Sequence, residues 1–283
     1  MTVDLQGAAD LHVHFGPDAH RERSVTALQA AREAAECGHA ALVLKSHDYP
    51  TPAVAAVVDQ SVDGVRVYGG ITCDRENGGV NPSAVDVALR LGAKVVWLPT
   101  LSGRQDVANG IAARLGIPGP GITVCADDGR LLESTQEVIE LVVASGAVLA
   151  TGHVSAIEHR AVAEAMRGRG RVLVTHAMEA HVGPNLSVDQ CVELAEIGAV
   201  IELCALTCLG TYATRSVDAL AACIRAVGAE RCTLASDLGQ AGNPHPAEGL
   251  QRFADLLVAA GVAEGDVRRM ACANPCALLG FGP

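Results

Sequence analysis

The chain has 283 residues, of which almost half are apolar and 2% are aromatic, and its formal net charge is −11. This length suits one large domain, and we expect residues 1–283 to form a single α/β domain with an aliphatic core. The acidic balance disfavours nucleic acid and anionic membranes as partners. No apolar run approaches the roughly 18 to 20 residues that span a bilayer, so we expect no membrane segment.

The N-terminus and the cysteines favour a cytoplasmic protein. Residues 1–10 carry acids and no basic region followed by an apolar block, so we expect no signal peptide. The ten cysteines lie mostly in apolar segments, as reduced and buried thiols do. Cys204 and Cys208, like Cys272 and Cys276, are four residues apart rather than paired as C-x-x-C, which argues against a structural zinc site.

Short runs rich in Val, Ile and Leu alternate with Ala-rich amphipathic stretches, which favours βα units and a parallel sheet. The predicted strands are Ala9–His14, Ala40–Lys45, Val65–Ile71, Lys94–Pro99, Ala147–Gly152, Arg171–His176, Ala199–Cys204 and Cys232–Asp237. The predicted helices between them are Ser24–Cys37, Pro52–Ser61, Pro82–Leu91, Ser134–Ser145, Ile157–Arg167, Val188–Ile197 and Val217–Val227. Two more helices, about Ala247–Ala260 and Glu264–Cys272, follow the last strand. Eight strands in this alternation predict a closed (β/α)8 barrel, the TIM barrel.

The longest connection between predicted elements runs from residue 100 to 141. It contains Ile122–Ala126, a turn at residues 127–129 and then Arg130–Leu132, a pattern that predicts a small β-hairpin after the fourth strand. We expect this hairpin to lie over the mouth of the barrel as a lid.

The first predicted strand ends in the sequence Asp-Leu-His-Val-His, residues 10–14. Because side chains alternate along a strand, His12 and His14 are expected on one face, with Leu11 and Val13 on the other. Two neighbouring imidazoles suit a transition metal better than an apolar interior, where each neutral ring still needs hydrogen-bond partners. Taken alone, the pair is equally compatible with polar residues at a strand end.

Ionisable residues recur at the C-terminal ends of the other predicted strands, where catalytic groups of such barrels lie. They are Lys45 and His47, His153, His176, Glu202 and Asp237. Each has an ordinary structural explanation, since Lys45 could extend to solvent and Asp237 could cap a helix. Independent coincidences at most strand ends are harder to accept, so the pattern predicts a shared metal site.

This pattern resembles the amidohydrolase superfamily of metal-dependent barrels, which carry His-x-His after the first strand, His after the fifth and sixth, and Asp after the eighth. The matching residues are His12, His14, His153, His176 and Asp237, and the match extends over the whole chain. The absence of flanking sequence for an extra β-sandwich makes the chain similar to compact, phosphotriesterase-like members. The resemblance implies one or two divalent cations, zinc first, with manganese or iron as alternatives.

One departure concerns the group that bridges two metals. Many dinuclear members carry a carboxylated Lys or a Glu at the end of the fourth strand, where this chain reads Val-Trp-Leu-Pro-Thr at residues 96–100. The suitable lysine is Lys45 on the second strand. Either a carboxylated Lys45 bridges two metals, or Lys45 is an ordinary cation beside a single metal. His47 would then be an extra ligand, a partner of the ligands or a substrate contact.

The resemblance implies hydrolysis by metal-activated water of an amide, cyclic amide, lactone or phosphoester bond in a small molecule. A metal lowers the pKa of bound water from about 15.7 toward 7. Asp237 would hold this water and act as the general base. His12, His14, Lys45, His153, His176 and Asp237 are the implied metal ligands. In a mononuclear site, His153 or His176 would instead polarise the substrate carbonyl.

Candidate substrate contacts lie on the loops that follow the strands. They are His47, Glu202, Arg21, Arg104 and His181, with His20, Arg23 and His245 as further candidates. The arginines suit a carboxylate or another anion, although each also fits an ordinary solvated surface. Glu202 is equally suited to orient a metal ligand. Small cyclic amides or lactones that bear a negative group are therefore the preferred substrates.

Three alternatives stay open. A metal-dependent decarboxylase of the same superfamily would use similar ligands. A nuclease would fit the barrel, but the acidic composition and the lack of basic clusters disfavour it. A barrel that binds a small ligand without turnover would have no need of Asp237 as a base. By analogy with other barrels, we also expect association into a homo-oligomer.

Overall fold

The computed structural model describes residues 2–281 of the chain. Eight parallel strands form one sheet whose order follows the sequence, so each strand pairs with the next one along the chain. The strands are β1 (Ala9–His14), β2 (Ala41–Lys45), β3 (Arg66–Thr72), β4 (Val95–Trp97), β5 (Val148–Ala150), β6 (Arg171–Val174), β7 (Val200–Cys204) and β8 (Cys232–Ala235). The expected (β/α)8 barrel is confirmed.

The barrel closes between β1 and the end of β8. The backbone N–H of Asp237 donates to the carbonyl of His12 at 2.9 Å. Asp10 reinforces this seam, because its Oδ1 accepts from the backbone N–H of His12 at 3.1 Å and of Ser236 at 3.0 Å. Asp10 and His12 therefore join the first strand to the residues that follow the last one.

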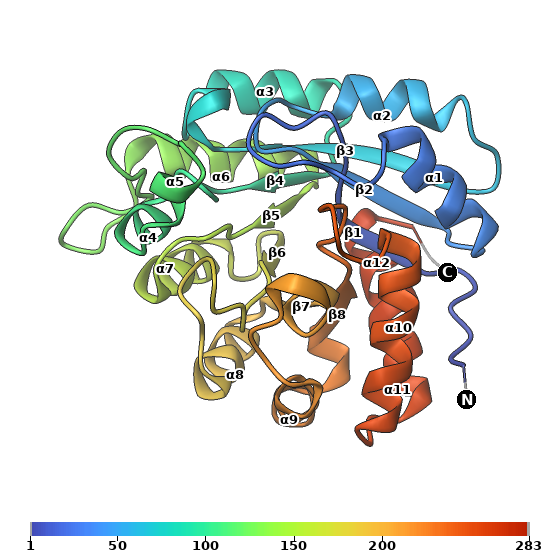
Figure 1. Ribbon diagram of the computed structural model, residues 1–283. Helices are drawn as coiled ribbons and strands as arrows, with labels where there is room; N and C mark the ends of the chain where they lie inside the picture. Colours follow the sequence, from blue (N-terminus) through green and yellow to red (C-terminus); the bar gives the residue numbers. More distant parts are fainter. Residues whose placement is uncertain (1, 282–283) are drawn as a thin grey trace.

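The helices surround the strands, as Figure 1 shows. They are α1 (Ala27–Glu36), α2 (Pro52–Asp59), α3 (Pro82–Arg90), α4 (Arg104–Ala108), α5 (Ile111–Arg114), α6 (Glu133–Ser145), α7 (Ala156–Met166), α8 (Val188–Ile197), α9 (Val217–Val227), α10 (Pro246–Ala259), α11 (Glu264–Arg268) and α12 (Asn274–Leu279). Thr26, Ser155 and Ser187 begin α1, α7 and α8 with reciprocal side-chain caps. None of the helices within residues 2–281 is long and apolar enough to cross a membrane.

The core has an inner and an outer part. Inside the barrel, small and aliphatic residues such as Ala9, Val43 and Val148 pack with Trp97, and Leu278 of α12 joins the same cluster. The outer part lies between the strands and the surrounding helices. The barrel interior is thus filled by side chains, and the polar groups lie at its C-terminal rim.

A bulge changes the expected alternation of β1. The register between β1 and β2 shifts between Asp10 and Val13. Val13 packs outward against α1 as expected, but Leu11 lies in the interior cluster instead of opposite His12. The prediction for Leu11 is wrong because the bulge adds one residue to the strand, which breaks the period of two.

The segment after β4 is more helical than expected. It holds the short helices α4 and α5, which stand at one side of the barrel in Figure 1. The expected hairpin is reduced to a turn, in which Cys125 and Leu131 form an isolated antiparallel bridge and the N–H of Ala126 donates to the carbonyl of Arg130 at 2.8 Å. The turn residues therefore act as predicted, but the pairing is too short to make two strands.

Candidate metal centre

Three groups from the two ends of the chain meet at the rim of the barrel. Nε2 of His12 and Nε2 of His14 lie 3.2 and 3.1 Å from the same oxygen, Oδ1 of Asp237. All three side chains are buried, and their ligand atoms are close enough together to hold one metal ion. Nζ of Lys45 lies 2.9 Å from Nε2 of His12 on the same side.

A second pair of imidazoles adjoins this group. Nε2 of His153 lies 2.8 Å from Nε2 of His176. The ring of His176 stacks on that of His12, with centroids 5.8 Å apart. His14, Lys45, His153, His176 and Asp237 line one cavity of about 50 Å³. The structure therefore brings together the six residues that the sequence proposes as ligands, with His12 buried below the cavity.

Two of these residues have an uncommon backbone conformation. His176 has φ of 24° and Asp237 has φ of 52°, whereas side chains other than glycine rarely adopt positive φ. Each lies two residues after the end of its strand, β6 for His176 and β8 for Asp237. Such strain persists only where the surroundings enforce it, and it gathers at functional sites.

The Nδ1 atoms of two of these imidazoles face carboxylates. Nδ1 of His12 lies 3.1 Å from Oε2 of Glu202, and Nδ1 of His153 lies 2.6 Å from Oδ2 of Asp106. A proton on Nδ1, shared with the carboxylate, leaves Nε2 with a free lone pair toward the cavity. Metal-binding histidines commonly have this arrangement. The donor set therefore fits a divalent cation of the zinc type.

Burial sets the protonation of the site. It lowers the pKa of His14, His153 and His176 well below the usual range, so these rings are neutral and able to donate a lone pair. Burial raises the pKa of Asp237, although His12 and Lys45 oppose this effect. Burial acts in the same direction on Glu202, but His12 and the N–H of His176 outweigh it and lower the pKa of Glu202 to about 2.

Lys45 has an unusual environment for an amine. It is 1% exposed, and its Nζ lies 5.4 Å from the centre of the Trp97 ring. No carboxylate among residues 2–281 lies within 4.0 Å of this Nζ. Burial lowers the pKa of Lys45, while Asp237, Glu202 and Asp74 act in the opposite direction.

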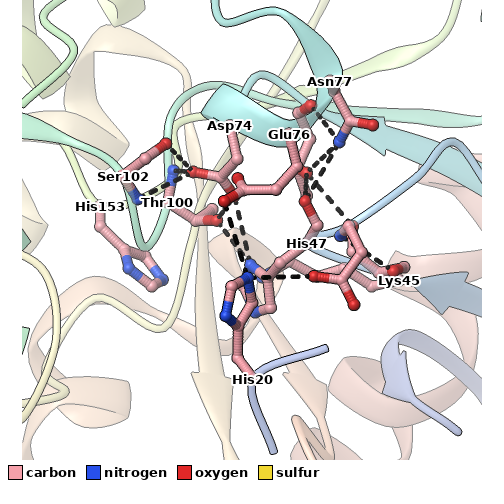
Figure 2. A network of polar contacts seen from close by, with 12 residues as sticks. His20, Lys45, His47, Asp74, Glu76, Asn77, Thr100, Ser102 and His153 are labelled. Carbon is pink, nitrogen blue, oxygen red and sulfur yellow. Dashed lines mark hydrogen bonds and ion pairs between the residues drawn. The ribbon is translucent and has the colours of Figure 1, made fainter. Parts of the chain in front are cut away.

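His47 is fixed by a polar network around Asp74, shown in Figure 2. Nδ1 of His47 lies 2.8 Å from the Thr100 hydroxyl and 3.2 Å from Oδ2 of Asp74. The other oxygen of Asp74 accepts from the N–H groups of Thr100 and Ser102 at 2.9 and 3.1 Å. The ring of His47 stacks on His14 at 5.0 Å and lines the same cavity. Its Nδ1 is therefore committed to the network, and burial lowers its pKa to about 3.

A family model matches residues 7–202, which is more than half of the chain. The chain belongs to DUF6282. This family is described as one of unknown function. No curated protein matches the chain.

Several solved structures share the fold of this DUF6282 protein at low sequence identity. An amidohydrolase from Pseudomonas aeruginosa is 13% identical with a TM-score of 0.63, over 97% of this chain and 95% of that one. The probable dipeptidase PvdM from the same organism is 10% identical with a TM-score of 0.66, over 96% and 94%. The 2,6-dihydroxybenzoate decarboxylase from Rhizobium is 11% identical with a TM-score of 0.57, over 97% and 98%. The resemblance to the amidohydrolase superfamily is confirmed at the level of the fold.

The candidate substrate residues of the DUF6282 chain occupy different places. Arg21, Arg23 and His47 line the cavity of the metal centre, and His181 lines a larger neighbouring cavity. Glu202 is fully buried beneath the site, where it contacts His12 and the backbone of His176. Glu202 therefore contacts the ring of His12 and does not line either cavity.

Three other candidates lie outside both cavities. Arg104 is exposed and pairs with Asp127 at 3.5 Å, so its contact with substrate stays a prediction. His20 faces Asp48 at 3.2 Å, and His245 is bonded to Glu33 at 2.9 Å.

Sequence reasoning missed two carboxylates that support the site. Asp74 follows β3, so the strand-end rule that identified the histidines would have found it. Asp106 lies on α4 within the long connection after β4, and no local pattern there points to the barrel mouth. Its role depends on the path of that connection.

Proposed function

We propose that this protein is a metal-dependent hydrolase that cleaves an amide, cyclic amide or lactone bond in a small molecule. The observation that carries the proposal is the convergence of four imidazoles and Asp237, from the ends of β1, β5, β6 and β8, at one rim of the barrel. An amidohydrolase and a probable dipeptidase of the same fold support a hydrolytic reaction.

We assign metal binding, proton transfer and ligand orientation to different side chains of the site. When bound, a divalent cation would acidify water to supply hydroxide near neutral pH and would polarise a carbonyl. His12, His14 and Asp237 would hold one cation, and His153 and His176 would hold a second or, in a mononuclear site, contact the carbonyl oxygen. Asp237 would accept a proton from the attacking water and return it to the leaving group. Glu202 and Asp106 would keep the rings of His12 and His153 in place.

Lys45 is proposed to carry a carboxylate on Nζ. An ammonium group 2.9 Å from Nε2 of His12 would repel a cation bound there, whereas a carbamate would offer two oxygens to it. The amine attacks carbon dioxide, a C–N bond forms, and one proton leaves the nitrogen. Growth or incubation with ¹³C-bicarbonate should give a carbamate carbon signal in the wild type that is absent from Lys45→Gln. No such signal in the zinc-loaded wild type excludes the carbamate.

Elemental analysis of protein purified without chelators tests the metal centre directly. We expect one or two zinc ions per chain, with manganese or iron as alternatives, and loss of activity on a panel of amides and lactones after chelation. Activity should return when zinc or manganese is added. A chain that holds no divalent metal with micromolar or tighter affinity would contradict the proposal.

A decarboxylase is the second candidate, because the same fold occurs in 2,6-dihydroxybenzoate decarboxylase. Asp237 in its protonated form could deliver a proton to carbon, whereas in hydrolysis its carboxylate receives one from water. Release of carbon dioxide from aromatic or unsaturated acids, without incorporation of ¹⁸O from labelled water into the organic product, would identify this reaction.

A further inference from the structure

A second, larger cavity adjoins the metal centre. It has a volume of about 370 Å³, and Arg21, Val182 and Leu206 line both it and the smaller cavity of the metal ligands. Ile111 and Leu115 add apolar surface, and both come from the connection after β4. A molecule with its reactive bond at the metal centre would therefore extend into this space, where aliphatic side chains would surround it.

Glu179 lines this cavity, and one of its carboxylate oxygens has no hydrogen-bond partner among the described residues. It follows β6 and is 2% exposed. Its Oε1 accepts from the N–H of Ala180 and of His181, both at 2.8 Å, and from the hydroxyl of Thr214 at 2.9 Å. Its Oε2 is buried and has no partner among the described residues. Because a buried carboxylate oxygen without a partner is costly, Oε2 is the atom left for an N–H donor from an occupant.

Arg21 supplies a positive charge without an acidic partner. No carboxylate in the described part of the chain lies within 4.0 Å of its guanidinium, which rests on the ring of Tyr212 at 5.1 Å from the centroid. The neighbouring Arg23 differs, because Asp18 binds it at 2.6 Å. Arg114, exposed on α5, adds a second positive charge at the same cavity. Arg21 is therefore available for a carboxylate.

We infer that the larger cavity binds an amino-acid moiety, so that the substrate is an amide of an amino acid with an aliphatic side chain. Arg21 holds its carboxylate, Oε2 of Glu179 accepts from its amine or amide N–H, and the wall of Ile111, Leu115 and Leu206 receives its side chain. Glu179 and Arg21 line the same cavity but form no ion pair with each other. Both are therefore available to a ligand that carries an amine and a carboxylate. The identity of the substrate rests on the proposed hydrolase function, whereas the binding of an amino-acid moiety in the larger cavity does not depend on it.

Three probes of nearly equal shape test the inference by titration calorimetry at pH 7. They are L-leucine, leucinamide, which lacks the carboxylate, and 4-methylpentanoate, which lacks the amine. Leucine should bind at least about tenfold more tightly than either analogue, because each analogue leaves a polar group of the cavity unpaired. Equal affinity for the three probes, or no binding of leucine at millimolar concentration, overturns the inference.

Variants assign each half of the preference. In Glu179→Gln, the affinities for leucine and 4-methylpentanoate should lie within about threefold of each other. In Arg21→Gln, the affinities for leucine and leucinamide should lie within about threefold of each other. Thr214→Val removes one donor to Oε1 but leaves Oε2, and Arg104→Gln changes an arginine outside both cavities. Both controls should keep the wild-type preference. A loss of preference in Thr214→Val equal to that in Glu179→Gln would mean that Glu179 acts only on the loop, against the inference.

Metal-free protein separates this site from the metal centre. Amino acids can themselves bind zinc. The tighter binding of leucine than of its analogues must therefore persist after a chelator has removed the metal, and also in Asp237→Asn. A preference seen only with zinc present contradicts the inference. Failure of the hydrolase proposal leaves the preference intact, so the two failures are distinguishable.

Discussion

Oδ2 of Asp106 lies 2.6 Å from Nδ1 of His153, and its Oδ1 accepts from the N–H of Gly183 at 2.7 Å. Asp106 belongs to α4, His153 follows β5, and Gly183 lies in the loop after β6. The buried side chain of Asp106 therefore links the segment after β4 to the loops after β5 and β6, which carry His153 and His176.

Replacing this carboxylate should weaken metal binding at the His153 and His176 side. Asp106→Asn keeps the shape but no longer accepts the Nδ1 proton with a full charge, and we expect metal affinity to fall about 10- to 100-fold. Competition with a fluorescent chelator measures the change. Asp127→Asn, at an exposed position of the same connection, is the matched control and should change affinity less than about twofold. Equal effects of the two variants would contradict an orienting role for Asp106.

Asp237→Asn should abolish turnover while most of the metal stays bound. The amide keeps an oxygen toward His12 and His14 but cannot accept a proton, and loss of a general base typically costs about 10²- to 10⁴-fold in rate. Activity and bound metal are measured on the same sample. Turnover within threefold of the wild type would remove Asp237 from the mechanism.

His159 of α7 should make stability depend on pH away from the active site. Its ring is buried, both nitrogens lack partners among the described residues, and burial lowers its pKa from 6.5 to about 4. Between these values the unfolded chain takes up a proton that the folded chain refuses. Stability therefore falls as pH drops from about 6.5 to about 4.

His159→Leu should flatten this dependence by about 1.4 kcal/mol per pH unit, measured by urea unfolding across the window. The pKa of the buried His39 is lowered to about 4 as well, so His39→Leu should flatten the curve independently. An unchanged slope in the double variant would show that neither ring stays neutral in the folded state.

Gly239→Ala should destabilise the rim behind His14. Gly239 has φ of 127°, and a Cβ there would meet the carbonyl oxygen of His14 at 2.0 Å. We expect a loss of more than about 2 kcal/mol, combining backbone strain and the displacement of β1. Gly7→Ala is the control, because its φ is also positive at 84° but nothing lies within 4 Å of its added methyl group. Gly7→Ala should lower the free energy of unfolding by about 1 kcal/mol. Equal losses for the two variants in thermal or urea unfolding would exclude a contribution from the clash with the His14 carbonyl.

The alternation of apolar runs and amphipathic stretches by itself determined the barrel and the positions of the strand-end residues. All eight strands are parallel, so their C-terminal ends must meet at one rim, and His12, His14, Lys45, His153, His176 and Asp237 converge for that reason. This convergence needs only the order of elements, which short-range periodicity encodes.

Only the tertiary structure decided what surrounds those residues. The bulge in β1 turned Leu11 inward, and the irregular path of residues 100–132 brought Asp106 to His153 while leaving Arg104 at the surface. Glu202 became the partner of His12 because β7 places it below the rim. Irregular connections have no period to follow, and their contacts arise from packing between segments distant in the chain, which local sequence patterns do not encode.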